Sequence, residues 1–179
     1  MCAAAQCQWR HLHANRFDGQ QCLGHTTHDL DLVIQLPPRQ IPTLVAAFTN
    51  PDYYIAEESV RAAYQPPHQF NVIHVPSALK ADFWLLGAVP FEREMFGRRI
   101  KDVWFGETIW LATAEDVILH KLYWNRITPS DRQLGDVTGV IHVQRGELDE
   151  TCLRHWGAEL GLASELENAL SGALKPKHT

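Results

Sequence analysis

The fold is decided by the stretch Gly24-His25-Thr26-Thr27-His28-Asp29-Leu30-Asp31-Leu32-Val33-Ile34. A glycine and small polar residues lead into an expected strand, along which side chains alternate between two faces. Asp29 and Asp31 should therefore share one face, about 7 Å apart along the strand. Two neighbouring carboxylates repel each other unless a positive charge lies between them, and Mg²⁺ often fills this role. A charged strand start whose aspartates cap a turn is the alternative for so short a pattern.

Length and composition limit the possible architectures. The 179 residues, 45% of them apolar, are enough for one globular domain with a proper core, with or without a smaller appendage. The net charge of -5 provides no overall attraction to nucleic acid, so any such binding would depend on a local patch.

The cysteines and the apolar runs indicate the cellular compartment. No apolar run approaches the roughly 18 residues of a membrane span, and no signal-peptide pattern is present, so no membrane partner is expected. The four cysteines lack Cys-x-x-Cys spacing, which favours free thiols in a reducing cytoplasm. A zinc site is the alternative for Cys2, Cys7, His11 and His13, but their spacing matches no common zinc site.

The order of apolar patterns divides the chain in two. The aspartate strand is followed by expected strands over residues 53–56, 69–75, 79–86, 100–105 and 108–112, with short helices between them. From Thr113 onward the sequence predicts only helices, the first with a threonine cap and an acidic first turn. We therefore expect an α/β domain over residues 1–112, of which 1–21 are atypical, a helical subdomain over 113–174 and a tail over 175–179.

A third aspartate extends the first pair. Asp82 lies within an otherwise apolar expected strand, where a lone carboxylate is costly unless it is paired or bound to a cation. Three carboxylates can hold two metal ions about 4 Å apart, and the turn at Gly24 allows backbone amides to approach a phosphate. This set favours metal-dependent chemistry on a phosphate ester.

Several stretches share their order and spacing with a known family: residues 27–33, 80–83 and 113–122, followed by Pro129-Ser130-Asp131-Arg132 and Leu134-Gly135-Asp136-Val137. Together they resemble the polymerase-β-type nucleotidyltransferase superfamily, and within it the small bacterial branch related to abortive-infection (toxin–antitoxin) nucleotidyltransferases. The resemblance covers roughly residues 22–170. It implies an α/β (α+β) fold, in which a short mixed sheet with flanking helices precedes a C-terminal helical bundle.

The resemblance also implies roles for particular residues. The catalytic residues and the ligands of a two-metal Mg²⁺ site would be Asp29, Asp31 and Asp82. The residues that contact the NTP would be Gly24, His25, Thr26, Thr27 and Lys121. Away from the resemblance, Lys121 is more simply a solvated helix lysine, and Asp131 and Asp136 are more simply helix-capping or solvated carboxylates.

The implied activity is transfer of a nucleotide from an NTP to a hydroxyl or phosphate acceptor on RNA, protein or a small molecule. An antitoxin-like protein is an implied partner. Residues 1–21 lack the paired small residues of this branch, and His25 replaces its arginine. The alternative is therefore a catalytically degenerate relative that binds nucleotide, metal or a protein without turnover. A metal-dependent nuclease is a third interpretation, but the strand Glu-x-Lys pattern is missing.

Overall fold

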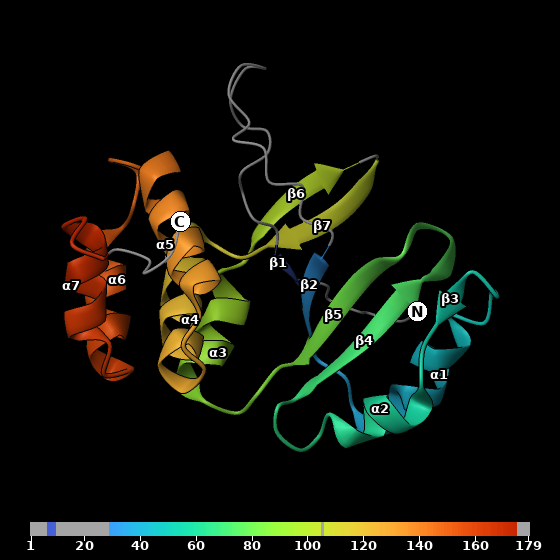
Figure 1. Ribbon diagram of the computed structural model, residues 1–179. Helices are drawn as coiled ribbons and strands as arrows, with labels where there is room; N and C mark the ends of the chain where they lie inside the picture. The colour runs from blue at the N-terminus through green and yellow to red at the C-terminus, as the bar shows by residue number, and fades with distance from the viewer. Residues whose placement is uncertain (1–6, 10–28, 105, 175–179) are drawn as a thin grey trace. The chain divides into compact units, whose positions relative to one another are not determined.

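The computed structural model describes residues 7–9, 29–104 and 106–174 (Figure 1). The described residues fall into two compact units, residues 7–9 with 29–111 and residues 112–174. The first unit combines a sheet with helices, and the second is helical. The predicted fold class, α/β followed by C-terminal helices, is therefore confirmed. No helix in the described part of the chain has the length and apolar character needed to cross a membrane.

The first unit is built on a mixed sheet. Its strands are β1 (Cys7–Trp9), β2 (Asp29–Ile34), β3 (Tyr53–Tyr54), β4 (Gln69–His74), β5 (Leu79–Leu85), β6 (Ile100–Trp104) and β7 (Glu107–Leu111). They are ordered β3-β4-β5-β2-β1-β7-β6. The central strands β2 and β5 are parallel, and β4 is antiparallel to β5. The two predicted hairpins, β4 with β5 and β6 with β7, are present.

Strand alternation gives the section β4-β5-β2 two different faces. On β5, Phe83 is buried on one face, and it pairs with Leu32 of β2 and Phe70 of β4. The Phe70 and Phe83 rings are stacked with their centroids 5.1 Å apart. Asp82, the residue before Phe83, must point to the opposite face because successive side chains of a strand alternate. The Phe83 ring and the Asp82 carboxylate thus lie on opposite faces of the sheet.

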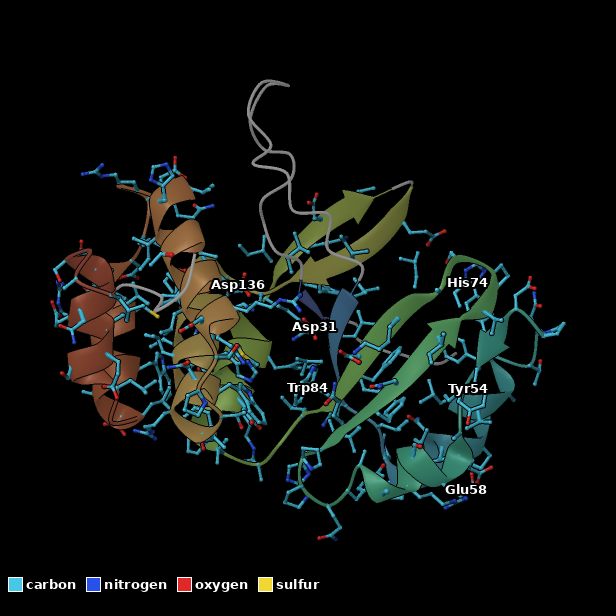
Figure 2. All side chains as sticks on the ribbon, viewed as in Figure 1. Asp31, Tyr54, Glu58, His74, Trp84 and Asp136 are labelled. Atoms are coloured by element: carbon cyan, nitrogen blue, oxygen red, sulfur yellow. The ribbon has the colours of Figure 1, made fainter. Side chains whose placement is uncertain are left out.

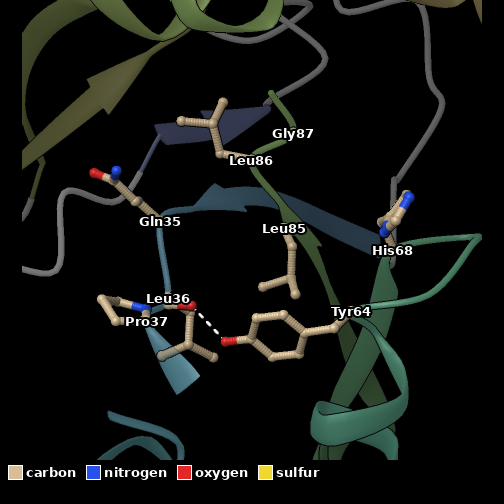
Figure 3. A pocket seen from close by; sticks show the side chains of 8 residues that line it. All are labelled: Gln35, Leu36, Pro37, Tyr64, His68, Leu85, Leu86 and Gly87. Carbon is tan, nitrogen blue, oxygen red and sulfur yellow. Dashed lines mark hydrogen bonds between the residues drawn. The ribbon is translucent and has the colours of Figure 1, made fainter. Parts of the chain in front are cut away.

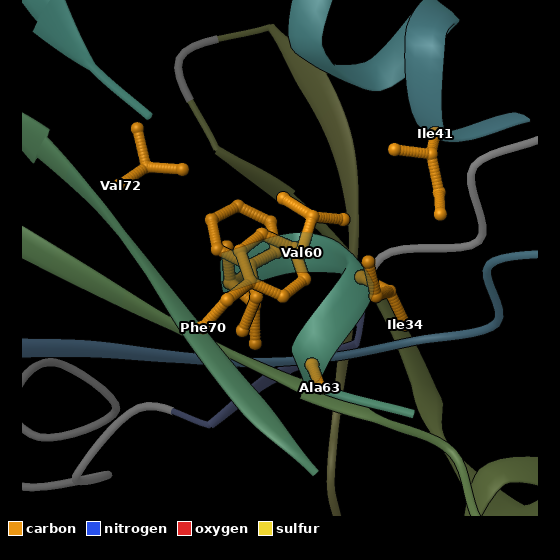
Figure 4. Packing of buried hydrophobic residues seen from close by; sticks show 8 residues of the cluster. Ile34, Ile41, Val60, Ala63, Phe70 and Val72 are labelled. Atoms are coloured by element: carbon orange, nitrogen blue, oxygen red, sulfur yellow. The ribbon is translucent and has the colours of Figure 1, made fainter. Parts of the chain in front are cut away.

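Short helices cover the apolar face. They are η1 (Pro38–Gln40), α1 (Ile41–Ala46) and α2 (Glu57–Ala62), and the unit also contains η2 (Val75–Ser77) and α3 (Pro90–Arg98). The cluster that joins these helices to the sheet comprises Leu32, Ile34, Ile41, Val60, Ala63, Phe70, Val72 and Phe83 (Figure 4). Burial of these side chains drives the packing of α1 and α2, which are too short to be stable alone.

The helices of the second unit are α4 (Ala114–Ile127), α5 (Asp131–Val143), α6 (Glu150–Glu159) and α7 (Ala163–Leu170). The predicted cap of α4 is present, because Oγ1 of Thr113 accepts a hydrogen bond from the backbone amide of Asp116 at 3.2 Å. Asp149 caps α6 in the same way, through the amide of Cys152 at 2.9 Å. The unit is held by fully buried side chains, among them Ile118, Leu119, Leu122, Val137, Leu153, Leu162 and Leu166.

Element bounds differ from the expected ones mostly by one residue at a strand end. The largest difference is the strand expected over residues 53–56, which is limited to β3, Tyr53–Tyr54, because only these residues pair with β4. Helix α3, Pro90–Arg98, begins at a proline, a favourable first residue for a helix. None of these differences changes the positions of Asp31 and Asp82.

Candidate functional site

Two of the predicted aspartates are neighbours across the sheet. Asp31 of β2 and Asp82 of β5 are register partners on adjacent parallel strands. Register partners present their side chains on the same face, and adjacent strands are about 4.8 Å apart. The carboxylates therefore lie within reach of a common cation. Figure 2 shows Asp31 on this carboxylate face together with Trp84.

Asp82 is well buried and is contacted from both sides. Its side chain is only 10% exposed, and its Oδ2 lies 2.9 Å from Nζ of Lys80, two residues earlier on β5. Asn71 of β4 is its register partner on the other side. In the amide orientation that satisfies both groups, the Asn71 nitrogen donates to Oδ1 of Asp82 at 2.7 Å. Both carboxylate oxygens of Asp82 thus have a protein partner, which explains how this carboxylate is tolerated within the sheet.

Asp31 is oriented by a tryptophan. Nε1 of Trp84 donates a hydrogen bond to Oδ1 of Asp31 at 3.3 Å. Trp84 follows Asp82 by two residues on β5, so both side chains lie on the carboxylate face. The resulting row, defined here as Asn71, Asp82 and Asp31, crosses three strands and is flanked along β5 by Lys80 and Trp84. We call it the carboxylate row.

The donors of the carboxylate row fit a hard divalent cation. Mg²⁺ prefers oxygen ligands and usually takes one or two carboxylates together with substrate phosphates. Asp31 and Asp82 supply such a pair on one face of rigid strands. No group of three or more His, Cys, Asp or Glu side chains arranged to hold a metal ion is present within the described residues. Among the described residues, Asp31 and Asp82 are thus the carboxylates that the carboxylate row offers to a cation.

The structure places the remaining predicted site residues of the first unit only in part. Asp29 is the first residue of β2, in register with Lys80 of β5, and its side chain lies outside the described structure. The predicted phosphate-contacting residues Gly24, His25, Thr26 and Thr27 all lie outside the described residues. Of the three predicted carboxylates, the structure therefore shows the side chains of Asp31 and Asp82 only, and these two are neighbours.

Lys121, the predicted phosphate ligand on α4, forms an ion pair within the helical unit. Its Nζ lies 2.7 Å from Oδ2 of Asp136 on α5, and the two side chains are only 17% and 20% exposed. The contact joins two neighbouring helices, so Lys121 has a structural partner in addition to the role implied by the resemblance. Asp131, also noted in the sequence, is the first residue of α5.

The histidine beside Lys121 is held neutral. Nε2 of His120 accepts a hydrogen bond from Nε1 of Trp124 at 2.9 Å, which requires an unprotonated Nε2. Burial, with a smaller contribution from the charge of Lys121, lowers the pKa of His120 to about 3. His74, another histidine noted in the sequence, belongs to β4 and alternates to the face opposite Asn71. It contacts Ser77 and the Tyr53 ring rather than the carboxylate row.

Sequence reasoning assigned no role at the site to Asn71, Lys80 or Trp84. Alternation alone places Lys80 and Trp84 on the face of Asp82, because they lie two residues before and after it. Asn71 needs a second piece of information, the register of the hairpin between β4 and β5. That register depends on the geometry of the intervening turn, where Ala78 adopts a positive φ of 53°.

A separate hollow lies beyond the carboxyl ends of β2 and β5 (Figure 3). Its volume is about 380 Å³, and it is lined by Gln35, Leu36, Pro37, Tyr64, His68, Leu85, Leu86 and Gly87. The Tyr64 hydroxyl donates to the carbonyl oxygen of Leu36 across it. Glu92 touches its rim at Gly87, and burial raises the pKa of the Glu92 carboxyl. Of the predicted site residues whose side chains the structure describes, Asp31, Asp82 and Lys121 are not among those that line the hollow.

Comparisons with known proteins give no relative: no family model matches the sequence, and no curated protein matches it. The assignment of function therefore depends on the residues and their geometry.

Proposed function

We propose that the protein is a Mg²⁺-dependent nucleotidyltransferase that moves a nucleotide from an NTP to a hydroxyl or phosphate acceptor on RNA, protein or a small molecule. The observation that supports this proposal is the register pairing of Asp31 with Asp82 on one face of parallel strands. The resemblance of residues 27–33, 80–83 and 113–122 to polymerase-β-type nucleotidyltransferases adds the reaction class. We include a cytoplasmic location in the proposal, because the four cysteines lack Cys-x-x-Cys spacing.

In this proposal the chain's own residues position the reactants. Asp31 and Asp82 would hold the cation, while Trp84 orients Asp31, and Asn71 and Lys80 orient Asp82. The chemistry that Mg²⁺ supplies there is neutralisation of phosphate charge and activation of an acceptor hydroxyl. The acceptor oxygen attacks the α-phosphorus in line, its proton is lost to water, and pyrophosphate leaves. The catalytic contribution of the protein is thus mainly positioning and electrostatic stabilisation.

A labelling experiment tests this activity. The protein is incubated with Mg²⁺, with bulk tRNA or its own side chains as acceptor, and with NTPs labelled at either the α- or the γ-phosphate. We expect the α label, and not the γ label, to become covalently attached. Asp31→Asn and Asp82→Asn should each abolish this transfer, whereas Asp102→Asn, which removes an exposed carboxylate of β6, should retain it. Transfer of the γ label, or undiminished transfer by Asp31→Asn, would contradict the proposal.

One observation favours the second candidate, a degenerate relative that binds nucleotide, metal or a protein partner without turnover. Both oxygens of Asp82 are already bound, by Lys80 and Asn71. If neither contact is given up when a cation is offered, Asp82 has a structural role instead of a catalytic one. Calorimetric titration with Mg²⁺ and a non-hydrolysable NTP distinguishes the candidates when combined with the labelling result. Binding that Asp31→Asn abolishes, with no transfer of label to either acceptor, would favour the degenerate protein.

A further inference from the structure

Lys80 lies beside the carboxylate row and contacts it through Asp82. It lies two residues before Asp82 on β5, so the two side chains share a face, and its Nζ is 2.9 Å from Oδ2 of Asp82. It is also the register partner of Asp29 on β2. The Lys80 side chain is 36% exposed, whereas that of Asp82 is 10% exposed. The lysine therefore reaches the buried carboxylate from the solvent side.

The contacts of the carboxylate row make the charge of Lys80 important. Asp31 and Asp82 are adjacent like charges, and they repel each other unless a positive charge lies close to them. Asn71 and Trp84 donate hydrogen bonds to the row but carry no charge. Lys80 is the cation that the structure places directly on Asp82. A divalent cation that coordinated Oδ2 of Asp82 would compete with the Lys80 ammonium group for that oxygen.

We infer that Lys80 is a tethered counter-cation of the carboxylate row, which a divalent cation displaces from Asp82, and that Lys80 therefore sets the cation affinity of the site. This inference rests on the proposed function in one respect, the use of Asp31 and Asp82 as cation ligands. The side chain is suited to the exchange because it is long, flexible and partly solvated, so that its ammonium group can leave Asp82 without entering the core.

Manganese titration tests the inference, with the electron paramagnetic resonance signal of free Mn²⁺ as the readout. Lys80→Gln removes the competing charge and should bind Mn²⁺ about tenfold more tightly than the unmodified protein. Lys80→Arg keeps the charge and should remain within about twofold of the unmodified protein. The matched control is Lys101→Gln, which removes an exposed lysine of β6 and should also leave the affinity unchanged. Asp31→Asn locates the binding at the row.

The outcomes separate this inference from the proposed function. If the unmodified protein binds Mn²⁺ through Asp31, but Lys80→Gln binds equally or more weakly, the inference is wrong and the cation site stands. Asp31→Asn is tested in two backgrounds, the otherwise unmodified protein and Lys80→Gln. If it leaves Mn²⁺ binding unchanged in both, the inference and the cation site are both wrong.

A second measurement needs no substitution, in case Lys80→Gln does not fold. Reductive ¹³C-methylation of the lysines keeps their charge and gives each an NMR signal. Addition of Mg²⁺ should move the Lys80 signal toward that of a solvated lysine and leave the Lys101 signal in place. Mg²⁺ binding, seen by calorimetry, with a stationary Lys80 signal would overturn the inference.

Discussion

Asp31 and Asp82 pair in register across two parallel strands, and each is held by a different neighbour on the same face of the sheet. Trp84 donates to Asp31, and Lys80 contacts Asp82. The pair is thus preorganised, because both carboxylates belong to rigid strands and neither depends on a loop for its position. A cation that binds between them should therefore stabilise the folded protein relative to the unfolded chain.

Mg²⁺ should stabilise the protein against heat, because it binds the folded state and not the unfolded chain. At a free Mg²⁺ concentration about ten times the dissociation constant, the gain is about 1.4 kcal/mol. Thermal melts followed by circular dichroism should show a higher Tm with Mg²⁺ than without. Asp31→Asn should remove this difference, and the exposed control Asp102→Asn should keep it. An equal shift in Asp31→Asn would place the stabilising ion elsewhere.

Asn71→Asp should make the protein more dependent on the cation. The substitution keeps the shape of the side chain but places a third carboxylate beside Asp82, its register partner. Without Mg²⁺ we expect a loss of about 1 kcal/mol in the free energy of unfolding, from like-charge repulsion and the lost hydrogen bond. The Tm shift on adding Mg²⁺ should exceed that of the unmodified protein. Asn71→Ala, which removes the bond without adding charge, should show no such enlargement.

The buried neutral His120 should make stability fall in mild acid. Its folded pKa of about 3 is below the unfolded value of about 6.5, so only the unfolded chain takes up a proton between these values. The contribution of neutral His120 to the free energy of unfolding is therefore fully present above about pH 6.5 and is lost as the pH decreases. The free energy of unfolding should fall by up to about 2 kcal/mol between pH 7.5 and 5. Urea unfolding at these pH values measures the loss.

His120→Gln should reduce this pH dependence, because glutamine does not titrate and its amide oxygen can still accept the Trp124 hydrogen bond. His142→Gln is the control, since it removes an exposed histidine of α5. If both variants keep the slope of the unmodified protein, the pH dependence comes from groups other than His120.

The ion pair between Lys121 and Asp136 should be energetically coupled. Both side chains are mostly buried, so removing one partner leaves a charge poorly solvated. In a double-mutant cycle with Lys121→Met and Asp136→Asn, we expect a coupling energy of about 1–2 kcal/mol from urea unfolding. A coupling near zero would show that Lys121 does not stabilise the contact between α4 and α5, and it would favour the phosphate-binding role.

Phe83 should be essential to the core on the apolar face of β5. Its ring is 4% exposed and stacks on Phe70, so Phe83→Ala should cost about 3–5 kcal/mol in the free energy of unfolding. Leu79→Ala on the same strand should cost less than about 0.5 kcal/mol, because that side chain is 46% exposed. Equal losses for the two variants in urea unfolding would contradict the difference in burial between Phe83 and Leu79.

The sequence was sufficient for features that depend on local patterns. The aspartate strand and the threonine cap of α4 were both predicted, because periodicity and capping chemistry act over a few residues. The shared face of Asp31 and Asp82 needed the added information of the family resemblance, since it depends on which strands are neighbours. The fold class followed from the order of these elements.

The interactions that the sequence could not supply are non-local. The hydrogen bond of Asn71 to Asp82 depends on a hairpin register, and the pairing of Lys121 with Asp136 depends on how two helices pack. Lys121 alone has the pattern of a solvated helix lysine, and only the three-dimensional contact with α5 shows that it is mostly buried. The periodicity of the sequence within one element does not predict contacts between side chains of different elements.

The two faces of β5 also limit how this chain can change over generations. Deletion of a single residue between the turn at Val75–Ser77 and Asp82 would move the following side chains of β5 to the opposite face of the sheet. Asp82 would then face the interior at the place of Ala81, and the Phe83 ring would lie on the opposite face at the place of Asp82. Length variation in this strand should therefore survive only in steps of two residues, whereas exposed positions such as Leu79 can be exchanged one at a time.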